Sequence, residues 1–204
     1  LMNMQDRDER TALHHASFSR ISIRDILDLL PEAHRLQAVE MRTDIGETIL
    51  HLAAPSGNVE SINTILELYP ESERLRAVCM PTRSGMTPLH YATEAEHSLA
   101  VLLESLPTSQ RFQAVCSRDA GNFMRQSGNV LFWAAHSNKL NAVCDMIRLL
   151  PESDRWQAVG LKGLDEKSLL DLIEDRDALK SIIRLLPHSN TTDRKRLQGV
   201  LQTR

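Results

Sequence analysis

Three histidines, His14, His51 and His90, occupy the last place of the same short phrase, Thr-x-Leu-His. Imidazole binds metal ions and moves protons near neutral pH, so such a set raises the question of a metal centre or an acid–base site. Either site requires the rings to converge. The phrase recurs at intervals of 37 and 39 residues, and later copies replace the histidine with Phe132 and Leu170. We therefore predict that each ring lies in its own repeat and has a structural role.

The cysteines give no better case for chemistry. Cys79, Cys116 and Cys144 are odd in number and form no Cys-x-x-Cys pair, which argues against disulfides and zinc and suggests a reducing compartment. Cys144 beside His136, or Cys79 beside a neighbouring histidine, lacks a catalytic signature and an orienting third group. Phosphate-binding glycine loops, His-Glu-x-x-His and Gly-x-Ser-x-Gly motifs are absent. We predict no catalytic, cofactor or metal site, and a protein that is not an enzyme.

Composition limits the remaining classes. The 204 residues are 42% hydrophobic, enough for a core, and the net charge of −3 with a pI near 6.3 argues against nucleic-acid binding. No apolar run approaches the roughly 18–20 residues that cross a bilayer, and the first residues carry no secretory segment. We expect a cytoplasmic protein. A start at Leu1 suggests a piece of a longer chain.

A repeated phrase organises the whole chain. The segments LPEAHRLQAV, YPESERLRAV, LPTSQRFQAV and LPESDRWQAV share Pro-x-x-x-Arg-x-x-Ala-Val, and a late copy, RLQGV, ends at residue 200. The five prolines are 39, 37, 44 and 36 residues apart. Repeats of this length indicate a solenoid. We expect a single domain, 1–204, of five units at about 1–39, 40–78, 79–115, 116–159 and 160–204.

We expect each unit to form three helices. In the second unit Thr48 is a helix N-cap residue, and a short helix should follow until Gly57. Apolar residues at helical spacing over 59–69 predict a second helix. Pro70 ends it, since proline disfavours helical geometry in the residue before it, and starts a third helix over 71–78.

The phrases Thr48-Ile-Leu-His-Leu-Ala-Ala54, Gly57-Asn-Val-Glu-Ser-Ile62 and Thr87-Pro-Leu-His-Tyr-Ala92 resemble the ankyrin repeat. Asp44-Ile-Gly46 and Arg83-Ser-Gly85 resemble the hairpin turn of that family. The usual ankyrin period is about 33 residues, and the added Pro-x-x-x-Arg helix accounts for the excess here. Lengthened repeats of this kind are similar to those of ankyrin-containing effectors that intracellular bacteria inject into host cells.

The resemblance implies an all-α, ankyrin-like solenoid of five extended repeats and a module that binds a partner protein through its concave face and hairpin loops. For an effector, the partner is a host protein and the location is the host cytosol. It implies a monomer without cofactor, nucleic acid, membrane or small-molecule substrate. Two alternatives stay open: a substrate-recruiting domain of a larger enzyme, and a spacer or cover for an adjacent domain.

Recognition is expected where the repetition fails. Residues after the first helix of each unit vary and should be exposed, while Tyr91 and Trp133 should pack between helices. The distance from the Val that ends a unit to the next helix cap is nine residues twice, but fourteen from Val115 to Asn129, so 118–128 should form a longer finger. Its Phe123 either folds onto the adjacent repeat or anchors a partner. The predicted partner-binding residues are Phe18, Pro55, Ser56, Met86, Glu94, Phe123, Met124, Arg125, His136 and Ser137.

The recurring arginine should build the scaffold. A partner rarely needs the same contact five times, so we expect each arginine to bond helix-end carbonyls of a neighbouring unit. Leu36, Leu75, Phe112 and Trp156 should pack beneath. Glu32, Glu71 and Glu152 lie three residues before their arginines, within reach of a weak helix pair. The arginines are Arg35, Arg74, Arg111, Arg155 and Arg196.

Overall fold

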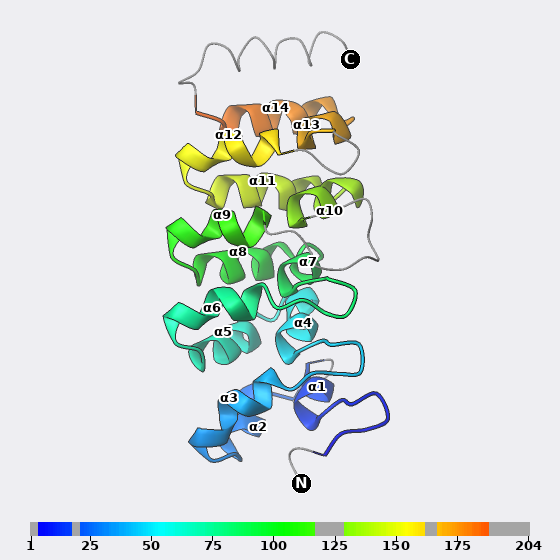
Figure 1. The fold of residues 1–204 in the computed structure, drawn as a ribbon, viewed down its shortest axis with the longest axis vertical. Coiled ribbons are helices and arrows are strands. Elements are labelled where there is room, and N and C mark those ends of the chain that lie inside the picture. Colours follow the sequence, from blue (N-terminus) through cyan, green and yellow to red (C-terminus); the bar gives the residue numbers. More distant parts are fainter. Residues whose placement is uncertain (1–3, 18–20, 117–128, 162–166, 188–204) are drawn as a thin grey trace.

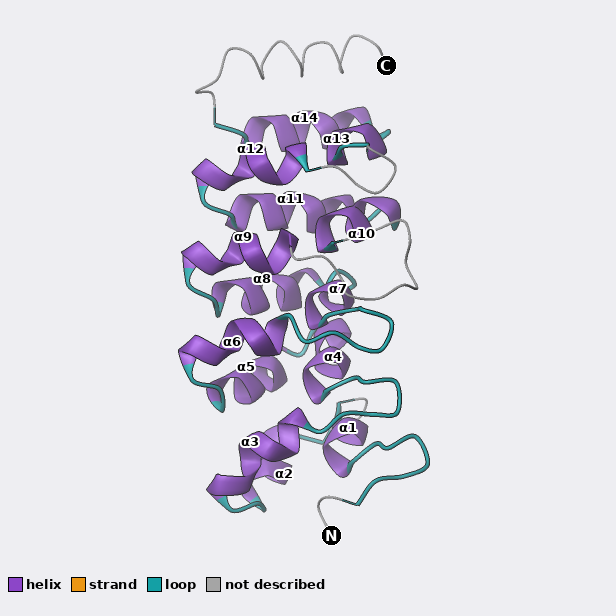
Figure 2. Cartoon of the chain, in the orientation of Figure 1, coloured by secondary structure: helices purple, strands orange, loops and turns teal. Residues whose placement is uncertain are grey.

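The computed structural model describes residues 4–17, 21–116, 129–161 and 167–187. These residues form helices and loops and contain no strand (Figure 2). The helices stack into one elongated body with the N-terminal unit at one end (Figure 1). The expected all-α solenoid of ankyrin-like repeats is confirmed.

Three columns of helices run along the stack. The first column, the A helices, comprises α1 (Ala12–Ala16), α4 (Ile49–Ala53), α7 (Pro88–Ala92), α10 (Val130–His136) and α13 (Leu169–Leu172). The B helices are α2 (Ile23–Asp28), α5 (Val59–Glu67), α8 (Glu96–Glu104), α11 (Leu140–Leu149) and α14 (Arg176–Leu185). The C helices are α3 (Glu32–Glu40), α6 (Glu71–Val78), α9 (Thr108–Cys116) and α12 (Glu152–Gly160). A short 3-10 turn, η1 (Ala54–Ser56), follows α4.

Local sequence sets these boundaries. Thr48 is the N-cap of α4, and Gly57 ends η1 with a φ of 72°, a left-handed conformation that glycine adopts without strain. The Asn58 side chain then accepts the N–H of Ser61 and starts α5. Pro70 is the N-cap of α6. The three helices expected in each repeat are therefore seen in the second unit, with their predicted breaks.

One hydrophobic core runs through the stack. Each unit contributes fully buried residues from its A and B helices, such as Leu50 and Ile62 in the second and Leu131 and Val143 in the fourth. A helices pack on neighbouring A helices and B helices on neighbouring B helices. Each unit thus buries its apolar faces against its neighbours, as solenoids do.

The predicted bond from the recurring arginine to a carbonyl of the next unit is present between units three and four and between units four and five. Arg111 Nη1 donates to the Leu149 carbonyl of the next unit at 3.2 Å. Arg155 Nη1 donates to the Leu185 carbonyl of the next unit at 2.9 Å. Both acceptors lie at the C-terminal end of a B helix, where carbonyls lack a helical partner. The apolar residues expected beneath, Leu36, Leu75, Phe112 and Trp156, all pack against the core.

The same prediction is wrong at two other positions. Arg35 donates to the Leu30 carbonyl at 3.2 Å and pairs with Asp28 at 3.0 Å, so both partners belong to its own unit. The Asp28 carboxylate, about one helical turn before Pro31, binds the guanidinium and holds it within the first unit. Arg74 makes no hydrogen bond or ion pair with any described residue, and its Nε is buried. Arg196 and the segment RLQGV lie outside the described residues.

The place of Arg74 explains its lack of partners. It lines a groove of about 350 Å³ between α5 and α8, together with Glu67, Glu104 and Ser105. Ser105 stands where the fourth and fifth units have Leu149 and Leu185, two residues before the proline. A serine thus borders the groove at the place where those two units have a leucine.

The weak helix pairs between each arginine and the glutamate three residues earlier do not form in the described helices. Glu32, Glu71 and Glu152 are exposed, whereas Arg35 and Arg155 turn inward toward carbonyl groups. The backbone acceptors lie beside the core and the carboxylates face water, so the arginine cannot contact both.

Candidate partner-binding surface

The hairpins between units share one set of bonds. The Thr43 N–H donates to the Glu47 carbonyl at 2.9 Å, and the Gly46 N–H donates to the Thr43 carbonyl at 2.8 Å. Residues 82–86 repeat both bonds at 2.8 and 3.0 Å. Gly46 has a φ of 86°, and a Cβ there would lie 2.8 Å from Nη2 of Arg42. The glycine is therefore required by both backbone geometry and space.

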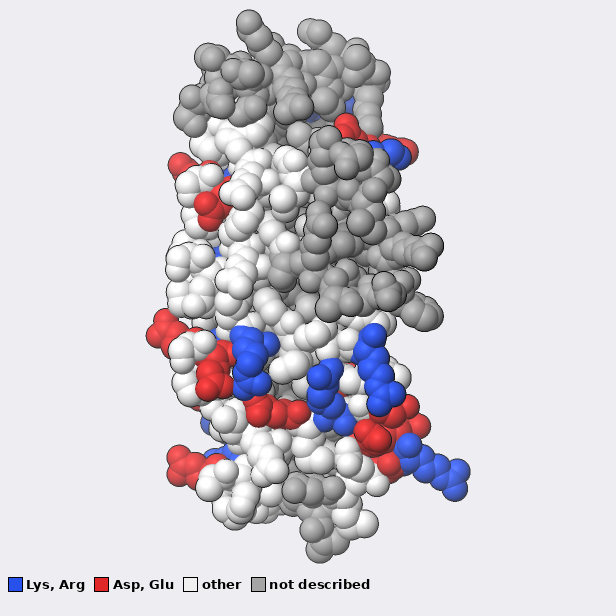
Figure 3. Space-filling model, viewed as in Figure 1, with Lys and Arg blue, Asp and Glu red and all other residues white. Residues whose placement is uncertain are grey.

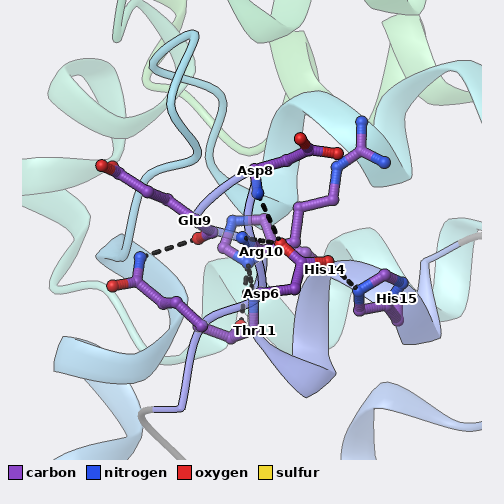
Figure 4. A network of polar contacts seen from close by, with 8 residues as sticks. Asp6, Asp8, Glu9, Arg10, Thr11, His14 and His15 are labelled. Carbon is purple, nitrogen blue, oxygen red and sulfur yellow. Dashed lines mark hydrogen bonds and ion pairs between the residues drawn. The ribbon is translucent and has the colours of Figure 1, made fainter.

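The first unit has the same hairpin with a different side chain (Figure 4). Asp6 stands where the second unit has Thr43, and its carboxylate accepts the N–H groups of Asp8 at 3.0 Å and Arg10 at 2.9 Å. The bond from Arg10 is the main cause that lowers the pKa of Asp6. His15 Nε2 lies 2.8 Å from the same carboxylate. This hairpin is held by an acidic residue instead of a threonine.

Neighbouring hairpins bond to one another and form a continuous row. The Asp44 N–H donates to the Asp8 carbonyl at 3.0 Å, and the Arg83 N–H donates to the Ile45 carbonyl at 2.9 Å. Arg42 donates its Nε to the Gly46 carbonyl at 3.0 Å and bonds the Pro81 carbonyl. The tip of the second hairpin carries Ile45, whose side chain is 48% exposed. A large apolar side chain thus faces solvent from a backbone fixed on both sides.

The repeated histidines cap the N-terminal ends of their A helices. The Thr48 N–H donates to Nδ1 of His51 at 3.0 Å, and the Thr48 hydroxyl lies 2.9 Å from the same nitrogen. This arrangement is a capping box in which histidine replaces the usual Glu or Gln. Because Nδ1 accepts a hydrogen bond, the proton is on Nε2, which donates to the Met86 carbonyl of the next hairpin at 3.2 Å. The predicted structural role is confirmed for this ring.

Burial keeps these rings neutral. His51 and His90 are almost fully buried, and desolvation lowers the pKa of each to about 4. Burial also lowers the pKa of His14. A neutral imidazole whose Nδ1 accepts from the backbone is not a proton shuttle at neutral pH. In the described part of the chain, no group of three or more His, Cys, Asp or Glu side chains could hold a metal ion.

The thiols are likewise unreactive. Burial raises the pKa of Cys116 to about 12 and also raises the pKa of Cys144. A thiol must ionise to act as a nucleophile. Both cysteines are therefore protonated at neutral pH and serve as small packing residues.

The residues that follow the histidines pack between repeats, as expected. The ring of Tyr91 meets the ring of His51 edge to face, with centroids 5.4 Å apart, and Trp133 meets His90 in the same way at 6.2 Å. The Tyr91 hydroxyl donates to the Glu47 carboxylate at 2.8 Å. These aromatic side chains hold the A helices in register behind the hairpin row.

The predicted contact residues lie in successive loops between A and B helices. Ser56, Glu94 and His136 are exposed, and Pro55 and Ser137 are partly buried. A Cβ on Gly57 would lie 3.8 Å from the Cβ of Ala95, so the loops of the second and third units are adjacent. Glu94 pairs with Lys139 of the fourth unit at 2.7 Å. The structure therefore brings these residues into one line along the stack.

The remaining predicted contact residues are partly buried or lie outside the described residues. Met86 is partly buried, and its carbonyl is used by the hairpin and by His51. Phe18, Phe123, Met124 and Arg125 lie outside the described residues, as does the expected finger at 118–128. Ile45 was not predicted, although an aliphatic residue at a turn that carries Ser84 in the next hairpin is a visible signal.

Charged side chains of both signs are mixed on the surface. Figure 3 shows blue and red groups together over the lower half of the stack. Among the ion pairs of the N-terminal units, Arg76 of α6 pairs with Glu73 at 2.8 Å and with Glu40 of α3 at 2.5 Å. Such mixed charge suits a defined partner better than a polyanion. Among the described residues, no helix is long and apolar enough to span a membrane.

An elongated stack of paired A and B helices, with hydrogen-bonded hairpins along one side, is the architecture of the ankyrin repeat fold, and this chain adds a C helix to its first four units. Among solved structures, the chain is similar to the ankyrin repeat domain of Bcl-3, a member of the IkappaB protein family. The two share 16% identity with a TM-score of 0.57, over 90% of this chain and 86% of that one. This likeness concerns the fold. No family model and no curated protein matches the sequence.

Proposed function

We propose that this chain is a protein–protein interaction module that contacts its partner with the hairpin row and the loops after the A helices. The observation that carries this proposal is the exposed Ile45 at the tip of a hairpin bonded on both sides. A fixed backbone loses little conformational entropy on binding, and a desolvated apolar side chain supplies affinity.

The loops after the A helices extend this surface. Their residues differ from unit to unit, from Ser56 to Glu94 to His136, while the buried positions behind them repeat. Packing does not dictate the exposed residues, so they are free to match a partner. The similarity to the ankyrin repeat domain of Bcl-3 supports the scaffold on which this proposal rests.

A narrower form of the proposal places the module in an effector that intracellular bacteria deliver into a host cell. There it would act as a monomer on a host protein in the cytosol. The lengthened repeats, with their added C helices, support this narrower form.

Site-specific photo-crosslinking tests the surface. A photoreactive residue is introduced at Ile45 or Glu94, and at the exposed Gln113 of α9 as a matched control on the C helices. We expect one protein to crosslink from positions 45 and 94 and not from position 113. A partner that crosslinks only from position 113 would place the contact on the C helices and contradict the proposal.

A loss-of-binding variant complements this experiment. Ile45→Ser introduces the residue type that the third hairpin carries at Ser84. The side chain packs little against the fold, so thermal stability should change little while capture of the crosslinked protein falls about tenfold or more. Equal capture by both proteins would remove Ile45 from the contact.

A further inference from the structure

The first unit exposes a leucine whose counterparts in other units are partly buried. Leu29, at the end of α2 and two residues before Pro31, is 75% exposed. The same place in the second, fourth and fifth units holds Leu68, Leu149 and Leu185, and all three pack against the core. The difference is one of neighbours, because each of these three units stacks on a preceding unit.

A methionine in the first unit shows the same contrast. Met4 is 67% exposed, seven residues before Thr11. Met41 and Met80 lie seven residues before their own threonines and are partly buried. Met80 Sδ lies 3.9 Å from Nη1 of Arg42, in the hairpin of the preceding unit. This methionine position therefore packs against the preceding repeat.

Hydrogen-bonding groups on this face follow the pattern of an interior joint. The Leu149 and Leu185 carbonyls accept an arginine from the preceding C helix, at 3.2 and 2.9 Å. The Leu29 carbonyl holds the corresponding place in the first unit. The first unit thus offers an acceptor at the place where the later joints use one.

Charges on the face are also complementary to a preceding B helix. Arg24 of α2 donates to Thr64 at 3.1 Å and to Glu67 at 3.0 Å on the next B helix. In the first unit, Asp25 and Asp28 take the places of Thr64 and Glu67. A basic residue at the position of Arg24 in a preceding repeat would meet the Asp25 carboxylate and that of Asp28, which also pairs with Arg35 of its own unit.

We propose that the N-terminal face of the first unit, formed by Met4, Asp25, Asp28 and Leu29, is the docking surface for a further repeat of the same type. The repeat joins this chain through the hairpin at residues 6–9, which already has the bonds of the interior hairpins. It covers Leu29 and Met4, and its C-helix arginine donates to the Leu29 carbonyl. This inference does not depend on the partner-binding surface, which lies on another side of the stack.

A fusion protein tests the proposal. A copy of residues 79–115, the third unit, is joined in register ahead of residue 3, so that Val115 of the copy precedes Asn3. We expect the midpoint of urea unfolding to rise by about 0.5–1 M, because an added stacked repeat buries new surface. A fusion with an unchanged or lower midpoint would overturn the proposal.

Two substitutions show whether this face makes the contact. Leu29→Glu should leave the midpoint of the 204-residue chain within about 0.2 M, since the side chain is already exposed, and should lower that of the fusion by about 0.5 M or more. Gln113→Glu on the exposed face of α9 is the matched control and should be neutral in both. Alanine at the copied arginine that corresponds to Arg111 should also lower the midpoint of the fusion.

Sedimentation velocity tests whether a second copy of this chain, rather than a further repeat, covers the face. If a second copy of this chain covers the face, the 204-residue protein will be a dimer that Leu29→Glu converts to a monomer. That result would overturn the proposal, and a monomer insensitive to Leu29→Glu supports it. Equal effects of Leu29→Glu on the 204-residue chain and on the fusion would also contradict it.

Discussion

The first three units and the last two share one arrangement of A and B helices but hold it with different polar contacts. In the first three, a buried histidine closes the A helix. In the fourth, Asn129 accepts the Phe132 N–H, and in the fifth, Ser168 and Asp171 cap each other. The same apolar packing therefore accepts several caps, and only the histidine cap uses a side chain whose ordinary pKa lies near neutral.

The bonds of the recurring arginines also differ between the N-terminal and the C-terminal units. Arg111 and Arg155 donate to the next unit and close the two C-terminal joints. Arg35 bonds within its own unit, and Arg74 lines a groove. The repeated phrase thus accompanies a C helix in the first four units, whereas the bonds of its arginine differ from unit to unit.

Acid should affect the histidine-capped units most strongly. The pKa of His51 and of His90 is about 4 in the folded protein and about 6.5 when unfolded, so the unfolded state binds more protons between these values. Stability should fall as the pH drops from 6.5 toward 4, by on the order of 3 kcal/mol for each ring. Urea unfolding at pH 7.5 and 5.0, with hydrogen exchange to locate the loss, checks this.

A double substitution isolates the cause. Thr48→Asn with His51→Phe introduces the fourth unit's pair, Asn129 and Phe132, into the second unit. This variant should lose the part of the pH dependence that His51 contributes, on the order of 3 kcal/mol between pH 6.5 and 4, while His14 and His90 keep theirs. Unchanged pH dependence would assign the acid response to groups other than His51.

Core deletions should cost the same in both regions. Leu50 of α4 and Leu131 of α10 are equivalent and fully buried, so Leu50→Ala and Leu131→Ala should each lower the unfolding free energy by about 2–5 kcal/mol. Chemical denaturation measures both. A much smaller cost for Leu50 would show that the N-terminal units also differ in packing.

The arginine ladder gives the next largest contrast. Arg155→Ala removes three hydrogen bonds that Arg155 donates to the carbonyls of Leu150, Leu185 and Arg148. It should lower the unfolding free energy by about 2–3 kcal/mol. Arg74→Ala removes a guanidinium without described partners and should change stability by less than about 0.5 kcal/mol. Equal costs in thermal or urea unfolding would refute the difference between the joints.

Lys139→Ala should have the smallest effect. The ion pair between Lys139 and Glu94 is exposed, and such pairs contribute about 0–1 kcal/mol. Unfolding in low and high salt should show a loss of this size that salt removes. Partner binding is the more sensitive measurement, since Glu94 lies on the proposed surface.

Much of the fold could be predicted from the sequence, because its signals are local. Pro70 and Gly57 mark helix ends by backbone chemistry, and the spacing of apolar residues over 59–69 marks a buried face. The proline and the apolar spacing recur in other units, so an error in one copy is corrected by the rest, whereas Gly57 has no glycine counterpart in them. The role of His51 was predicted in the same way, from its recurrence at one place per repeat.

The remaining contacts depend on residues distant in the sequence. Arg74 and Arg111 lie in the same repeated phrase, yet Arg74 lines a groove and Arg111 donates to the Leu149 carbonyl of the next unit. Ile45 is one aliphatic residue in a turn, and its exposure follows from the positions of neighbouring hairpins. The predicted contact residues Ser56 and Glu94 are exposed, and their use by a partner stays a prediction.

Hydrogen exchange of the protein bound to the partner recovered by crosslinking tests the central claim most directly. We predict slowed exchange in the hairpins at 41–48 and 80–87 and in the loops at 55–58 and 93–95, with α6 and α9 unchanged. Protection confined to the C helices, with no change in the hairpins, would contradict the account.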